Sequence, residues 1–136
     1  MKKKIEVVGI VPVKAKSDRV KKKNLRKFGD TNLFELKLNQ LKKTKNFKYI
    51  VVSSEDKRIL DKAKKKGFQT HLRDPYYSTS NVPMSEVYSY LGSSVTAEHV
   101  AWINVTNPLA GSKIYDDAVN LYRKTLNKFD CLLSAI

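Results

Sequence analysis

A cation-rich segment, residues 12–24, holds the side chains best suited to chemistry. It contains five lysines and one arginine against a single acid, Asp18. Like charges at this density repel one another unless an anion lies among them or water screens them. Ser17 and Asn24 add a hydroxyl and an amide that can hydrogen-bond to an anion. The composition therefore predicts either a site for a polyanion, such as a triphosphate, or a solvated connector.

Two common phosphate-binding motifs are missing from this segment. A Walker A loop requires Gly-x4-Gly-Lys-Ser/Thr, and the dinucleotide fingerprint requires Gly-x-Gly-x-x-Gly. Residues 12–24 contain no glycine. Any anion recognised here would be held mainly by side chains, not by a glycine-rich backbone.

Apolar runs of strand length alternate with amphipathic segments along the chain. The runs cover residues 5–11, 49–53, 68–72, 99–105 and 131–136. Helical spacing is found in residues 31–44, in 54–67 with Gly67 at the end, from Met84 to Leu91, and after Ser112, which is expected to cap the helix. This alternation predicts an α/β fold with a mostly parallel sheet and right-handed crossovers.

Polar or cationic residues follow the first four expected strands directly. They lie in residues 12–24, at Ser53-Ser54, in residues 73–84 and in residues 106–111. In an open parallel sheet, ligands bind beyond the carboxyl ends of the strands. We therefore expect these segments to meet at one edge of the sheet and to contact a ligand there.

The chain has 136 residues, of which 41% are hydrophobic. This size and composition predict one domain over residues 1–136. A lone cysteine, Cys131, excludes an intrachain disulfide, is expected in a buried strand, and favours a cytoplasmic location. No run approaches the roughly 20 apolar residues of a membrane span, so no membrane partner is expected. Because the sequence stops at Ile136 inside an apolar run, we expect it to be the N-terminal part of a longer domain.

Four segments, taken together, resemble the signature of the CMP-sialic acid synthetases (acylneuraminate cytidylyltransferases). The first, "IVPVKAKSDRVKKKNLRKFGDTNLF", is similar to the family's opening P/L-A-R-x-x-S-K-x4-K-N-I/L-x4-G-x-x-L. "IVVSSEDKRILDKAKKKG" follows its V-V-S-T-D-D segment, and "HLRDPYYSTSNVPMSEVYSYL" its R-P-x-x-L-A-x-D-T-A-S segment. "INVTNPLAGSKIYDDAVNLY" is similar to L-Q-P-T-S-P-L-R. The resemblance covers nearly all of the sequence, in order.

The resemblance implies a Rossmann-like, three-layer nucleotidyltransferase fold whose C-terminal part is missing here. It also implies a reaction in which the anomeric hydroxyl of a sugar acid attacks the α-phosphate of CTP, giving CMP-sugar and pyrophosphate. CTP and the sugar acid are thus the expected partners, and full-length relatives are expected to be homodimers. Mg²⁺ is the expected cofactor, with its ligands beyond residue 136 and none within this chain, so this chain alone is not expected to turn over substrate.

Matched position by position, the resemblance assigns roles around the nucleotide. Lys23 would be catalytic and would stabilise the α-phosphate and the leaving group. Lys14 would bind the β- and γ-phosphates, where the family has arginine. Ser17 and Asn24 would bind CTP from the same loop. Arg73 would lie near the cytosine and the ribose.

The resemblance also assigns residues to the sugar side, and the sequence departs from the family's pattern at several positions. Asn104 and Thr106 would reach toward the sugar. Asp18 stands where the family has lysine, and Ala110 where it has arginine. Residues 80–84, "SNVPM", replace D-T-A-S-S, which bears on recognition of the base.

Other interpretations stay open beside this one. A basic module that binds nucleic acid or another polyanion would interleave aromatic with basic residues on an exposed surface. The segment 12–24 has no aromatic residue, and Tyr49, Tyr88 and Tyr122 fall at core-like positions, so nucleic acid is not the expected partner. Arg73 could instead form a surface ion pair with Asp74.

Overall fold

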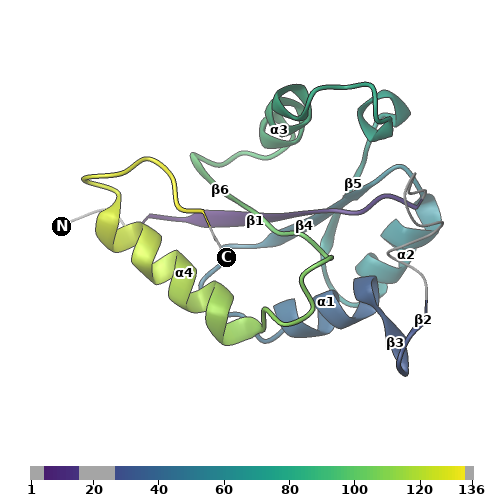
Figure 1. Ribbon diagram of the computed structural model, residues 1–136, viewed down its shortest axis with the longest axis horizontal. Helices are drawn as coiled ribbons and strands as arrows, with labels where there is room; N and C mark the ends of the chain where they lie inside the picture. Colours follow the sequence, from purple (N-terminus) through teal and green to yellow (C-terminus); the bar gives the residue numbers. More distant parts are fainter. Residues whose placement is uncertain (1–4, 16–26, 134–136) are drawn as a thin grey trace.

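The computed structural model describes residues 5–15 and 27–133, and its centre is a four-stranded parallel sheet (Figure 1). The strands are β1 (Val7–Pro12), β4 (Ile50–Ser54), β5 (Gln69–Leu72) and β6 (His99–Trp102), in the order β5-β4-β1-β6. β1 and β4 are almost wholly buried, which explains why both are continuous apolar runs. The predicted α/β fold with a parallel sheet is confirmed.

Helices cover both faces of this sheet. α1 (Leu33–Leu41), α2 (Lys57–Lys65) and α4 (Ser112–Thr125) lie below it in Figure 1, and α3 (Met84–Ser93) lies above it with the short 3₁₀ helix η1 (Pro75–Ser78). Phe34, Leu38 and Leu41 of α1 are fully buried against the lower face. Burying each such side chain stabilises the fold by about 1.5–3 kcal/mol. Val87 and Leu91 of α3 pack on the upper face.

Two predicted helices begin later than expected because a side chain caps each one. A short hairpin, β2 (Lys27–Phe28) and β3 (Thr31–Asn32), precedes α1, and Asn32 Oδ1 accepts a hydrogen bond from Glu35 N at 2.8 Å. Asp56 caps α2 in the same way, through Arg58 N at 2.8 Å. Gly67 follows α2 with a φ of +89°, which confirms the predicted glycine at the helix end.

The predictions for the last two segments are partly wrong. Ser112 does not cap α4, because the helix already begins there and Gly111 precedes it without a side-chain cap. Of the expected strand 131–136, Cys131–Leu133 form no strand, and the rest lies outside the described residues. A strand needs a neighbour for its backbone groups, and among the described residues none pairs with Cys131–Leu133. Cys131 is exposed, not buried.

The strand order locates the ligand-binding edge. From β1 the chain moves outward to β4 and β5 on one side, then crosses to β6 on the other side of β1. The carboxyl ends of β1 and β6 therefore form a topological switch point, where ligands bind in open α/β sheets. In the described part of the chain, no helix is long and apolar enough to cross a bilayer. The single domain over residues 1–136 stays a prediction.

Candidate functional site

The loops that follow the four parallel strands meet at the carboxyl edge of the sheet, as expected. Lys14, just after β1, is half-buried there, and Val13 N donates to Ser53 O of β4 at 2.8 Å. Ser17, Lys23 and Asn24 lie outside the described residues. Their roles, like that of Lys14, stay predictions.

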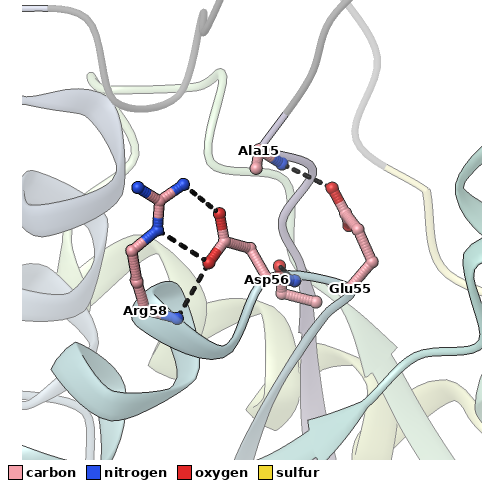
Figure 2. Close-up of polar contacts among 5 residues, drawn as sticks. Ala15, Glu55, Asp56 and Arg58 are labelled. Atoms are coloured by element: carbon pink, nitrogen blue, oxygen red, sulfur yellow. Dashed lines mark hydrogen bonds and ion pairs between the residues drawn. The ribbon is translucent and has the colours of Figure 1, made fainter.

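Glu55 ties three of these loops together. It directly follows β4, and its Oε1 accepts a hydrogen bond from Ala15 N at 2.8 Å (Figure 2). Its Oε2 accepts one from Ser78 Oγ of η1 at 3.2 Å. The carboxylate thus fixes the start of the cation-rich loop against the loop after β5. Sequence reasoning missed Glu55, although an acid directly after a buried strand beside so many cations was a usable signal.

Arg73, at the end of β5, is buried, with 2% of its surface exposed. Its backbone N donates to Ser54 O at 2.8 Å, and one guanidinium nitrogen donates to Ser53 O at 2.9 Å. Its Nε is buried and lacks a hydrogen-bond partner. A buried donor left unpaired costs about 1–3 kcal/mol, so Arg73 retains hydrogen-bonding capacity that an acceptor could use.

Electrostatics around Arg73 keep this buried cation charged. Burial lowers the pKa of Arg73, while the charge of Glu55 and, to a smaller extent, Tyr90 raise it. A guanidinium stays protonated in proteins, so the site presents a fixed positive charge. The surface ion pair with Asp74 is wrong: Arg73 is buried, and Asp74 Oδ1 accepts instead from Tyr76 N at 2.9 Å.

Aromatic rings connect the loop that begins at Arg73 with α3. The rings of Tyr77 and Tyr90 stack with centroids 3.8 Å apart and planes within 4°. The Tyr90 hydroxyl accepts a hydrogen bond from Asp74 N at 3.0 Å, which fixes the backbone next to Arg73. These contacts join the loop after β5 to α3.

Ser53 and Ser54 differ from the expectation that they contact a ligand. Both are buried, at 1% and 0% exposure. Ser53 Oγ shares a hydrogen bond with His71 Nδ1 at 2.9 Å, and Ser54 Oγ accepts from Asp56 N at 3.2 Å. Burial and the nearby Arg73 charge lower the pKa of His71, so the ring is neutral at pH 7. The hydroxyls of Ser53 and Ser54 therefore form hydrogen bonds within the fold.

Asn104 and Thr106 both face outward from the segment after β6. They alternate with Ile103 and Val105, which are 2% and 3% exposed, so the two polar side chains point away from the core. Asn104 Oδ1 accepts a hydrogen bond from Trp102 Nε1 at 3.0 Å. The structure thus places both residues, exposed, at the end of the strand beside β1.

A buried lysine of α1 holds the rest of this segment. Lys37 is 0% exposed, and its Nζ donates to Asn107 O at 2.7 Å, Ala110 O at 3.0 Å and Tyr115 Oη at 2.8 Å. Burial lowers the pKa of Lys37 to about 8. Sequence reasoning missed this residue too. Its signal was a lysine at a position of α1 where the helical period requires an apolar residue.

Comparisons with known proteins agree with this geometry. The cytidylyltransferase family model matches residues 8–131. A search of curated proteins found no match. A CMP:2-keto-3-deoxy-manno-octonic acid synthetase solved with CTP superposes with a TM-score of 0.72 at 12% identity, over 88% of this chain and 48% of that one.

Two further solved structures are similar. A cytidylyltransferase from Leptospira borgpetersenii serovar Hardjo-bovis (strain JB197) gives a TM-score of 0.66 at 25% identity, over 87% of this chain and 49% of that one. The 4-diphosphocytidyl-2C-methyl-D-erythritol synthase from Anaerococcus prevotii gives 0.62 at 16% identity, over 88% and 52%. The chain spans about half the length of these proteins. Its fold is the Rossmann-like α/β fold of nucleotidyltransferases, and the chain belongs to the cytidylyltransferase family.

Proposed function

We propose that the site binds CTP and that the protein transfers its cytidylyl group to a sugar acid of the sialic acid type. Arg73 is the observation that carries this proposal. It is a buried guanidinium with an unpaired Nε at the carboxyl edge, in a chain of the cytidylyltransferase family. In this proposal it binds the nucleoside end of CTP, in line with the resemblance to the CMP-sialic acid synthetases.

The proposed step is a displacement at phosphorus. The anomeric oxygen of the sugar acid bonds to the α-phosphorus, the bond to the β-phosphate oxygen breaks, and pyrophosphate leaves with that electron pair. The hydroxyl proton is lost to solvent or to a base. Negative charge builds up on the leaving group, which positioned cations stabilise. Lys23 and Lys14 are proposed to supply these cations, with Ser17 and Asn24 as hydrogen-bonding partners of CTP.

Mg²⁺ remains a proposal as well. The described residues contain no group of three His, Cys, Asp or Glu side chains that could hold a metal ion. The Glu55 carboxylate is already used by Ala15 N and Ser78 Oγ. The described site does not fit a metal centre, so no step above depends on one, and ligands are proposed beyond residue 136.

The sugar acid is the least constrained part of the proposal. The sialic acid assignment is supported by the sequence segments that resemble the CMP-sialic acid synthetases. The solved neighbours name other acceptors, a 2-keto-3-deoxy-octonic acid and a methylerythritol derivative. Asn104 and Thr106 are proposed to contact the acceptor, because both are exposed beside the switch point.

The length of the chain bears on turnover. Because it spans about half of its solved neighbours, CTP binding without catalysis by this chain alone is the second candidate function. A homodimer, as the resemblance implies for full-length relatives, is proposed on that resemblance, and a cytoplasmic location on the single cysteine.

Thermal unfolding with CTP, with ATP and without nucleotide, each with and without Mg²⁺, tests the proposal. A ligand at 100 times its Kd adds about 2.7 kcal/mol, which raises the midpoint by several degrees. We expect a rise with CTP and little with ATP. Equal shifts with both nucleotides would contradict recognition of cytosine, and no shift would contradict CTP binding.

Two variants separate the base side from the acceptor side. Arg73→Lys keeps the charge but loses the planar fork, so CTP affinity should fall at least tenfold by calorimetry. An N104A/T106V double variant removes two exposed polar groups and the acceptor of Trp102 Nε1, but no group proposed to bind CTP, so its CTP affinity should match the parent chain. Release of pyrophosphate with N-acetylneuraminate or 2-keto-3-deoxy-octonate as acceptor then reports turnover and the preferred sugar acid.

A further inference from the structure

A second concentration of positive charge lies away from the candidate site. Residues 42–69 contain nine lysines and one arginine against three acids, a net charge of +7 out of +14 for the whole chain. The loop from α1 to β4 and the loop from α2 to β5 carry most of these lysines. Both loops lie at the amino-terminal edge of the sheet, opposite the carboxyl edge where CTP is proposed to bind.

The two loops border a shallow, open hollow of about 310 Å³, because β4 and β5 are neighbours in the sheet. Its walls include the rings of Phe47, Tyr49 and Phe68 and the side chains of Lys42 and Lys66. Tyr49 was expected in the core, but it is only half-buried. Phe47 and Phe68 are also half-buried and pack on the core below, which fixes their position.

Basic and aromatic residues interleave in this surface. The α1–β4 loop reads "KKTKNFKY" from Lys42 to Tyr49, and the end of α2 with the loop after it reads "KKKGF" from Lys64 to Phe68. Proteins that bind single-stranded nucleic acid combine cations along the phosphate chain with fixed rings on which the bases stack. The segment 12–24 lacks this combination, and the amino-terminal edge has it.

The cations of this edge are largely available to an anion. Lys42, Lys43, Lys45 and Lys65 are exposed, and none of the ion pairs found among the described residues includes them. The nearest acid on α4, Asp116, already accepts hydrogen bonds from the backbone N of Lys45 and Asn46. Lys48 pairs with Glu6, and Lys66 donates to Asn39 Oδ1.

We propose that this amino-edge surface binds single-stranded nucleic acid, with the lysines on the phosphates and the rings against the bases. This function is separate from the cytidylyltransferase site and does not depend on it. An isolated phosphate would contact the lysines alone and would not contact the aromatic rings. A membrane surface would call for protruding apolar side chains, whereas these rings line a hollow and are half-buried.

Fluorescence anisotropy with a labelled, mixed-sequence 12-nucleotide RNA tests this proposal. A K42E/K65E variant should lose at least tenfold in affinity, and the fall of affinity with salt should become shallower by about 0.7 per lost phosphate contact. A K27E/K57E variant is the matched control: it reaches the same net charge by reversing two exposed lysines, one in β2 and one at the start of α2, at the opposite edge of the sheet, and its affinity should change by less than twofold. Tyr49→Leu should weaken binding about tenfold, while Tyr49→Phe should not.

Saturating CTP should leave RNA binding unchanged, since the two sites lie at opposite edges. Displacement by CTP would instead place the RNA at the nucleotide site and overturn the proposal. Equal losses in both double variants, or equal affinity for a 12-base-pair duplex, would reduce the interaction to general charge attraction. Binding to phosphatidylserine vesicles without binding to RNA would point to a membrane surface. The thermal midpoint of each variant checks that the fold is intact.

Discussion

Lys37 is a charged residue at a helix position that is ordinarily apolar. Because its side chain is buried, its loss of a proton should change the free energy of unfolding with pH. Burial lowers its pKa from 10.5 to about 8 in the folded state. Between these values the unfolded chain binds more protons, so the free energy of unfolding should rise with pH from about 8 toward 10. The rise should be about 1 kcal/mol per pH unit.

Tyr115, whose hydroxyl accepts a hydrogen bond from Lys37, limits the pH range over which stability is expected to rise. Burial raises its pKa from 10 to about 12, so the folded state keeps a proton that the unfolded state loses, and stability should fall again above pH 10. Urea unfolding at pH 7, 8, 9 and 10 measures the effect. Lys37→Met should remove the rise; parallel curves for the two proteins would show that Lys37 does not titrate in this range.

Single residues were predictable where they belong to a sequence motif. They were missed where their role depends on contacts that form only in the tertiary structure. Arg73 follows from its segment, and the structure adds that it is buried, which no local pattern indicates. Lys37 and Glu55 act through partners about 70 and 40 positions away in the chain. The sequence marks each residue as unusual at its position, but it does not indicate these distant partners, which only the folded structure shows.

At the scale of an element, α2 depends on Asp56 for its first turn. Asp56 Oδ1 accepts from Arg58 N at 2.8 Å, and the carboxylate pairs with the exposed Arg58 side chain (Figure 2). Asp56→Ala should lower the free energy of unfolding by about 1 kcal/mol, because the cap is lost. The ion pair itself contributes little at an exposed position.

Asp56→Asn separates the cap from the charge. It keeps the acceptor and should cost less than Asp56→Ala in urea unfolding at pH 7. Hydrogen bonding with the Arg58 side chain lowers the pKa of Asp56 below 3.8, so the stability it adds is present above that pH and is lost as pH falls through the lower, folded value. The advantage of the parent chain over Asp56→Asn should therefore shrink in acid; a constant difference would assign the effect to the cap alone.

Elements were predictable where burial and period agree. The runs at 5–11 and 49–53 became β1 and β4, since strands buried on both faces are apolar throughout. The run at 131–136 is also mostly apolar, yet no strand in the described part of the chain pairs with Cys131–Leu133. The β2–β3 hairpin was missed because its two-residue strands are too short to show a period. In both cases, pairing with a neighbouring strand decides whether the segment forms a strand. The amino-acid composition of a segment does not indicate that pairing.

At the scale of the whole molecule, the sheet order separates the two proposed binding sites. Loops at the carboxyl edge bring Lys14, Arg73, Asn104 and Thr106 to one side of the sheet, while the amino-edge surface lies at the other ends of the same strands. A ligand at one edge is therefore a full strand length from the other edge. This arrangement is why the CTP competition can distinguish the two proposals.

The net charge of +14 itself predicts how the whole molecule responds to salt. Positive charge is concentrated in residues 1–27, with a net +9, and in residues 42–69, with a net +7, so the folded state suffers self-repulsion. The screening length falls from about 30 Å at 0.01 M salt to about 8 Å at 0.15 M. The thermal midpoint should therefore rise with NaCl over this range. K42E/K65E lowers the net charge by four, to +10, and should show a smaller rise, whereas a midpoint that falls with salt in both proteins would mean that attractive ion pairs outweigh the repulsion.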